Sequence, residues 1–217
     1  MLRNDLPRAP GPQTLTPIAV GVRFLLSWRM RVPPILNVAA KVLLIALLLY
    51  AVANPEMPRF AGKAMGVRAV LYPLATLLIP FGWLLRGRPR PYPHAADTLL
   101  AGPFLIDVGG NVANLYDTVV WFDDAAHALT WMLLVFAVGA LFLRLRLAPW
   151  ITAALCIGFG SVTHVLWEIL EYLIMMSGRT GLHLTYGDTV GDLAASLSGS
   201  VLAGLVTGWI AARSSSG

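Results

Sequence analysis

Charged side chains are scarce in this sequence, at 12% of 217 residues, where a soluble domain has about a quarter. Apolar residues make up 57% and form runs of roughly the 20 residues that cross a bilayer as a helix. These proportions exclude a soluble globular domain, a disordered chain, and a collagen-like or coiled-coil protein. The sequence therefore predicts an all-α, polytopic membrane protein.

Cysteine is nearly absent: Cys156 stands alone, inside an apolar run. A single cysteine excludes an intrachain disulfide and a cysteine cluster around a metal. The sequence also lacks a glycine-rich phosphate loop and a Gly-x-Ser-x-Gly nucleophile elbow, so it does not indicate nucleotide binding. A Ser-His-Asp enzyme that uses Ser161, Ser196 or Thr189 is a weaker alternative.

We expect six transmembrane helices. Their predicted ranges are 35–53, 67–85, 96–115, 124–143, 148–176 and 188–212. Together they form one transmembrane domain over 35–212, preceded by a basic cytoplasmic tail over 1–34. Within that tail, 17–28 mixes apolar residues with an arginine and is expected to be either a short interfacial helix or a flexible segment.

Basic residues are unevenly shared between the two sides of the predicted membrane domain. With the tail in the cytoplasm, eleven of the sixteen Lys and Arg fall on that side, and this bias predicts cytoplasmic N- and C-termini. The enrichment of Lys and Arg on the cytoplasmic side thus explains the net charge of +5, and no nucleic-acid partner is needed to explain it. We expect a multi-pass protein of the cell inner membrane whose partners are membrane lipids. No sequence feature favours a particular oligomeric state.

Polar side chains recur at helical spacing in the last four predicted helices. The groups are Asp107, Asn111 and Asn114; Asp123 and His127; His164, Glu168 and Glu171; and Asp188 and Asp192. Spacings of three and four residues place each group on one helix face. Because a carboxylate in hydrocarbon costs at least about 2.5 kcal/mol, we expect these faces to meet. The predicted topology places all four groups in the outer half of the membrane, in a pocket open to the extracytoplasmic side.

Three motifs carry a resemblance to a known family. They are Phe122-Asp123-x-x-x-His127, Trp167-Glu168-x-x-Glu171-Tyr172, and Thr185-x-x-Asp188-Thr189-x-x-Asp192 followed by Gly199. The pattern resembles the YjdF-like family of small bacterial inner-membrane proteins. It is more faintly similar to VanZ-like proteins, which are associated with reduced sensitivity to a glycopeptide antibiotic. The resemblance implies an integral membrane protein with a site containing Asp123, His127, Glu168, Glu171, Asp188 and Asp192, but no particular reaction.

The first functional hypothesis is a metal-assisted or acid–base enzyme, a hydrolase or transferase, acting on a lipid-linked or cell-envelope substrate. The expected catalytic residues are His127, His164, Glu168, Glu171 and Asp192. The expected ligands of a divalent ion such as zinc or manganese are Asp123, His127, Glu168, Glu171, Asp188 and Asp192. Arg179 is a candidate partner for a substrate phosphate.

Two other interpretations use the same residues. One is a proton- or cation-coupled transporter or a lipid-binding membrane protein, which the confinement of the acids to the outer half disfavours. The other is purely structural hydrogen bonding, expected above all for the Asp107 group. Ser196, Ser200, Gly204 and Gly208 form a stripe of small residues that we expect to pack against a neighbouring helix.

Overall fold

The computed structural model describes residues 32–178 and 185–215, and all the regular structure in these ranges is helical. The elements are α2 (Pro34–Ala53), α3 (Met65–Thr76), α4 (Leu78–Leu85), α5 (His94–Val112), α6 (Leu115–Thr118), α7 (Phe122–Phe142), the 3₁₀ turn η1 (Leu143–Leu145), α8 (Pro149–Met176) and α9 (Tyr186–Ser215). The predicted interfacial segment 17–28 and Arg179 lie outside the described residues.

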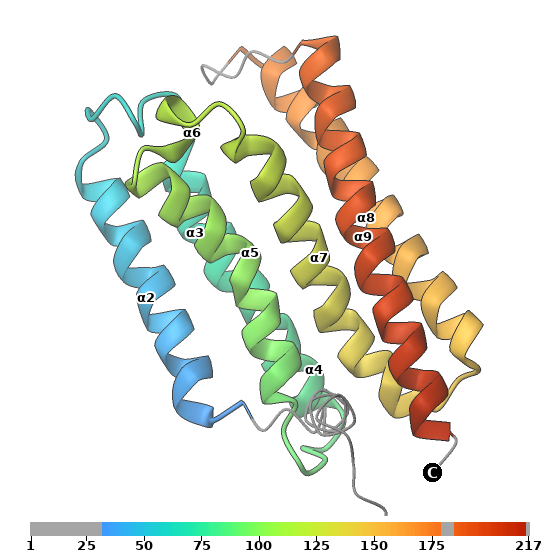
Figure 1. Ribbon diagram of the computed structural model, residues 1–217. Coiled ribbons are helices and arrows are strands. Elements are labelled where there is room, and N and C mark those ends of the chain that lie inside the picture. The colour runs from blue at the N-terminus through green and yellow to red at the C-terminus, as the bar shows by residue number, and fades with distance from the viewer. Residues whose placement is uncertain (1–31, 179–184, 216–217) are drawn as a thin grey trace, which may run out of the picture. The chain divides into compact units, whose positions relative to one another are not determined.

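The long helices run side by side and alternate in direction (Figure 1). Helix α2 therefore begins, and α9 ends, at the same end of the helix bundle. We call it the basic end, because its loops and the end of α9 carry Arg86, Arg88, Arg90, Arg144, Arg146 and Arg213. The opposite end, where α6 lies, is the α6 end.

Within 32–178 and 185–215, five helical segments are long and apolar enough to cross a membrane: Pro34–Ala53, Met65–Leu85, Phe122–Leu145, Pro149–Met176 and Tyr186–Ser214. They confirm that the chain is a polytopic membrane protein. The remaining predicted segment forms α5, which packs against both α2 and α7. Helix α5 carries acidic and amide side chains along its length, and it is not among these five segments.

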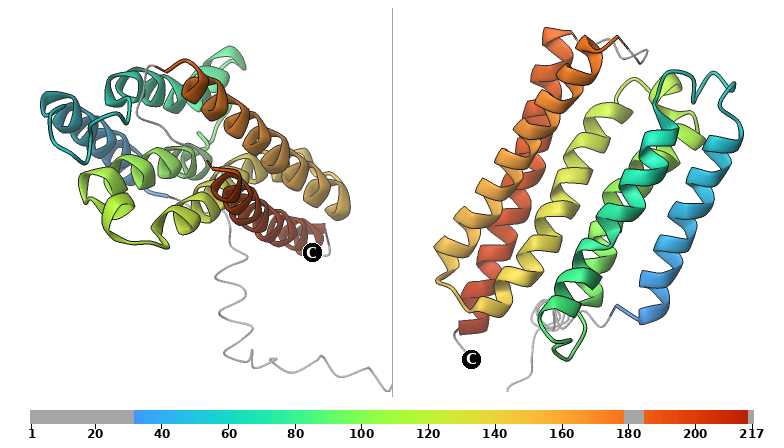
Figure 2. Two further views of the ribbon diagram at one scale, coloured as in Figure 1. Left: turned by 90° about the horizontal axis from the view of Figure 1, so that it is seen from above. Right: turned by 180° about the vertical axis from the view of Figure 1, so that it is seen from behind.

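A break at Leu77 divides the second predicted segment into α3 and α4. Proline has no backbone N–H, so Pro80 cannot donate to the carbonyl of Thr76, four residues earlier. At the break, the Leu77 N–H donates to the carbonyl oxygen of Leu74 at 3.1 Å, and the Thr76 hydroxyl donates to that of Pro73 at 2.7 Å. Seen from behind in Figure 2, the two short helices lie beside α5.

Helix α9 packs tightly against α7 and α8 through small residues, as the sequence predicts. A Cβ atom on Gly199 would overlap the carbonyl oxygen of Ala128 in α7, and one on Gly160 in α8 would overlap the Ser200 side chain. Further along, Gly204 lies against Ile157 of α8. These close approaches bring the polar faces of the three helices together near the α6 end.

Candidate functional site

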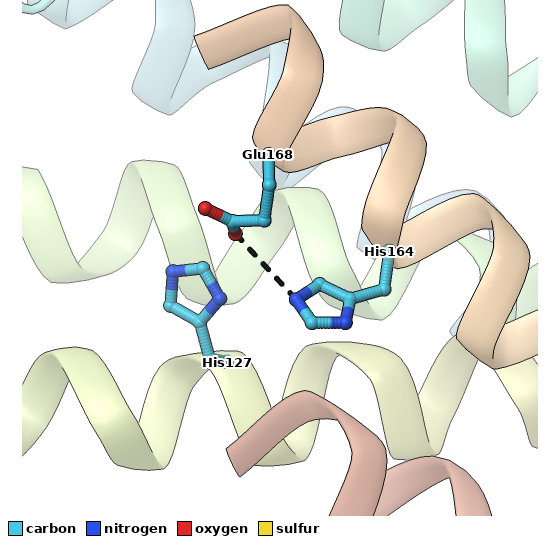
Figure 3. A group of neighbouring side chains, drawn as sticks. All are labelled: His127, His164 and Glu168. Atoms are coloured by element: carbon cyan, nitrogen blue, oxygen red, sulfur yellow. Dashed lines mark ion pairs between the residues drawn. The ribbon is translucent and has the colours of Figure 1, made fainter. Parts of the chain in front are cut away.

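Three helices supply the polar side chains of the site. Asp123 and His127 lie in the first two turns of α7, His164 and Glu168 in the second half of α8, and Asp192 in the second turn of α9. Because α7 and α9 run opposite to α8, all three positions fall toward the α6 end. Figure 3 shows His127 facing the His164 and Glu168 side chains across the space between α7 and α8.

His164 and Glu168 form the buried part of the site. Their side chains are only 2% and 7% exposed, and His164 Nε2 lies 3.5 Å from Glu168 Oε1. Neither this nitrogen nor either Glu168 oxygen has a hydrogen-bond partner among the described residues. The His164 ring is held from α7 by Trp131, whose ring centroid is 5.3 Å away. The helices thus fix two strongly polar groups in the interior without satisfying them.

His127 links this buried pair to a second set of carboxylates. Its Nδ1 atom lies 3.3 Å from the Ser196 hydroxyl oxygen of α9. Its Nε2 atom lies 3.5 Å from Asp192 Oδ1 and 3.8 Å from Asp123 Oδ1. The Asp192 side chain is 5% exposed, whereas that of Asp123 is 46% exposed. Asp123 therefore forms the accessible edge of the site.

In the part of the chain that the structure describes, two groups of three residues have ligand atoms within 4.8 Å of one another: His127, His164 and Glu168, and Asp123, His127 and Asp192. The separations of 3.5 Å exceed those of an ordinary nitrogen–oxygen hydrogen bond, which is about 2.7 to 3.2 Å long. They match the distance of about 3.4 Å between two ligands of a tetrahedral zinc ion with bonds of about 2.1 Å. The donor set and its spacing therefore fit a divalent metal ion.

Two of the residues expected at the site, Glu171 and Asp188, belong to neither group. Glu171 is half-buried, one turn further along α8 than Glu168. Asp188 is exposed at the start of α9, where its backbone N–H donates to the Thr185 side-chain oxygen at 3.1 Å. Thr185 thus caps the helix and Asp188 sits at its third position, where a negative charge is favourable.

The Asp107 group forms a separate network beside the site. Asp107 forms an ion pair with Arg68 and accepts a hydrogen bond from the Tyr72 hydroxyl at 2.6 Å. Asn111 Nδ2 donates to the Asp107 carbonyl oxygen at 2.9 Å. Burial and the Asp107 carboxylate raise the pKa of the nearby Tyr116 phenol, which therefore stays protonated. Arg68 of α3 thus neutralises the Asp107 carboxylate.

Sequence analysis also missed an ion pair at the basic end. Lys41 lies within the predicted helix 35–53, where its long side chain could reach the membrane interface. Its ammonium nitrogen instead lies 2.8 Å from both Asp97 oxygens, and Asp97 is only 1% exposed. The signal was present, since Lys41 and Asp97 both lie in the basic-end halves of two predicted helices, 35–53 and 96–115. Pairing them, however, requires knowing that α2 and α5 are neighbours.

A family model for predicted membrane proteins matches residues 35–214, a range that covers all the described helices except the terminal residues Pro34 and Ser215. The chain belongs to this family, DUF2238. Membership confirms an integral membrane protein and is consistent with the resemblance to YjdF-like proteins; it does not bear on VanZ-like proteins. No curated protein and no solved structure matches the chain.

Proposed function

We propose that this DUF2238 member is a metal-assisted enzyme, a hydrolase or transferase, with its active site between α7, α8 and α9. One observation carries the proposal. His164 Nε2 and both Glu168 carboxylate oxygens are buried without hydrogen-bond partners among the described residues, and His127 faces them from the neighbouring helix. Burying an unpaired polar group costs about 1 to 3 kcal/mol, more for a charged one. A bound cation would offset that cost.

The donor chemistry favours zinc or manganese. Two imidazole nitrogens and one carboxylate oxygen, with a position left for water or substrate, is a ligand set of catalytic zinc sites. Manganese accepts the same donors and tolerates more carboxylate ligands. His127, His164 and Glu168 would hold the ion. A divalent ion supplies Lewis acidity, which polarises a carbonyl or phosphoryl group of a substrate.

The surrounding residues have distinct proposed roles. Ser196 contacts Nδ1 of His127 and would fix the orientation of that ring, as residues around metal ligands commonly do, which leaves Nε2 for the ion. Asp192, whose Oδ1 atom lies 3.5 Å from that Nε2, would add a carboxylate beside the ion. Asp123, at the accessible edge, is placed to exchange a proton with a substrate group. Glu171 lies one turn beyond Glu168 and would take part only where a substrate reaches past the ion.

The arrangement of charge supports a substrate on the extracytoplasmic side. The site lies toward the α6 end, and the arginine-rich loops lie at the opposite end (Figure 1). Basic loops favour the cytoplasm, so the site would face outward. Exposed apolar side chains of α8, including Leu166, Ile169 and Leu170, flank it at the level of the membrane. A lipid-linked or cell-envelope substrate would reach the site from this surface.

A coupled transporter using the same residues is the alternative. Transport would require ionisable groups that continue from the site toward the other side of the membrane. The acids of α5 do not provide them: Asp97 is paired with Lys41, and Asp107 with Arg68. Because both carboxylates are already neutralised by fixed cations, the structure favours an enzyme confined to one side.

The decisive experiment measures metal content in full-length protein purified without chelators. We expect close to one zinc or manganese ion per chain by elemental analysis, and its loss in Glu168→Gln. The matched control is Glu56→Gln, which makes the same chemical change at an exposed loop position. Metal-free wild-type protein, or equal metal in Glu168→Gln and wild type, would overturn the proposal. Ion flux driven by a pH gradient across proteoliposomes that contain the metal-free protein would instead support the transporter.

A further inference from the structure

A second polar cluster lies far from the metal site, at the basic end. Side chains from α2, α4 and the start of α5 line an open hollow of about 340 Å³ there. Its polar and aromatic lining consists of Asn37, Lys41, Trp83, Tyr92, His94 and Asp97. The proposed enzyme activity uses none of them.

A buried carboxylate organises the wall of this hollow. Asp97 Oδ2 accepts hydrogen bonds from Asn37 Nδ2 and from the Tyr92 hydroxyl, each at 2.6 Å, in addition to the Lys41 ion pair. Burial and the hydrogen bond to Asp97 raise the pKa of Tyr92, so the phenol remains a donor. Asp97 thus holds Lys41 and Asn37 in fixed positions, and the Lys41 ammonium compensates the charge of the carboxylate.

The wall retains hydrogen-bonding capacity for a ligand. An ammonium group has three donor hydrogens, and Asp97 engages at most two of those on Lys41, whose side chain is 23% exposed. Asn37 is 5% exposed, and its Oδ1 atom has no hydrogen-bond partner among the described residues. The wall thus offers a cationic donor and an unsatisfied acceptor.

A short arginine-rich loop joins α4 to α5 beside the hollow. It carries Arg86, Arg88 and Arg90, all exposed. Two contacts hold this loop against the wall: Trp83 Nε1 donates to the Pro89 carbonyl oxygen at 2.8 Å, and the Trp83 and Tyr92 rings pack edge to face at 5.1 Å. The loop therefore carries three exposed arginines in the segment between Trp83 and Tyr92, two residues that line the hollow.

We propose that this hollow binds the headgroup of an anionic glycerophospholipid. The phosphate would lie between Lys41 and the loop arginines, and a headgroup hydroxyl would donate to Asn37 Oδ1. Basic pockets between membrane helices at the cytoplasmic side suit such headgroups. A lipid fits better than free phosphate because exposed apolar side chains adjoin the hollow, among them Val38 on α2 and Leu84 on α4. Acyl chains would lie along these two helices.

The test compares lipid binding to the full-length protein by native mass spectrometry in detergent. Phosphatidylglycerol is the probe and phosphatidylcholine the neutral reference lipid. Each Lys or Arg near an anionic lipid strengthens its binding by about fivefold, so the loss of two arginines should weaken binding by about 30-fold. We therefore expect Arg88→Gln/Arg90→Gln to lose about that much affinity for phosphatidylglycerol. The matched control is Arg144→Gln/Arg146→Gln, which removes the same charge from another loop at the same end.

Three outcomes would overturn the proposal. Equal losses in the two double variants would show attraction to the basic end as a whole. Equal binding of phosphatidylglycerol and phosphatidylcholine by the wild-type protein would show that the site does not select an anionic headgroup. Displacement of phosphatidylglycerol by millimolar inorganic phosphate would identify a free-phosphate site. The lipid site would be supported if the control double variant keeps its preference for phosphatidylglycerol, the Arg88→Gln/Arg90→Gln variant loses it, and inorganic phosphate does not displace the lipid.

Discussion

His164 Nε2 lies 3.5 Å from Glu168 Oε1 on the next turn of α8, and both side chains are almost fully buried. The separation is too long for a good hydrogen bond, and neither atom has another partner among the described residues. Such a pair costs stability when nothing lies between its members. The same spacing suits two ligands of one ion, so metal binding should also stabilise the fold.

Zinc should therefore raise the thermal stability of the protein in detergent. A ligand at 100 times its dissociation constant stabilises the folded state by about 2.7 kcal/mol. We expect the melting temperature to rise with added zinc and to fall after chelation. His164→Asn should abolish the response, and Glu56→Gln should leave it intact. If added zinc leaves the melting temperature of the wild-type protein unchanged, the result would argue against a bound ion.

The close approach of α7 and α9 predicts a position-specific effect of alanine. Gly199→Ala would place a methyl group on the Ala128 carbonyl oxygen, and we expect a loss of about 1 to 3 kcal/mol in the free energy of unfolding. Gly158→Ala is the control, since a Cβ there meets nothing within 4 Å. The measurement is denaturant unfolding in detergent. Equal stability of the two variants would mean that α7 and α9 are further apart than described.

The two lysine–aspartate pairs should differ in strength. Removing Lys41 leaves Asp97 buried without its cation, so Lys41→Met should cost about 3 to 5 kcal/mol. Lys63→Met breaks the exposed pair with Asp117 and should cost less than about 1 kcal/mol. Unfolding measurements on single and double variants give both coupling energies. Similar couplings would show that the Lys41 pair is solvated.

Cysteine labelling can test the proposed orientation, because the native Cys156 is buried. We expect Glu56→Cys, in the loop at the α6 end, to react with an impermeant maleimide added to intact cells. Arg88→Cys, at the basic end, should react only after the membrane is opened. Labelling in the reverse pattern would place the metal site on the cytoplasmic side and would contradict the proposed substrate access.

The polar groups that the sequence picks out differ in their outcome. Asp123, His127, His164, Glu168 and Asp192 converge because helical spacing fixes which side chains share a face, and charge in hydrocarbon forces those faces together. Glu171 and Asp188 have the same spacing but fall outside both ligand groups. Helical spacing fixes the face of the helix that a side chain occupies, but it does not fix its position along the bundle relative to the neighbouring helices. A difference of one turn is enough to place a carboxylate outside a group of ligand atoms.

The amino-acid sequence by itself determines that this protein spans a membrane as helices, that the histidines and acids of its last three helices gather toward one end, and which helix faces they occupy. Hydrophobic length, spacing and the cost of exposed charge act locally, so they can be calculated from the sequence. Only the tertiary structure decides which cations neutralise Asp97 and Asp107, and that His127 faces His164 and Glu168. Those contacts depend on which helices are neighbours, and small residues such as Gly199 set that packing through backbone distances of a few ångströms.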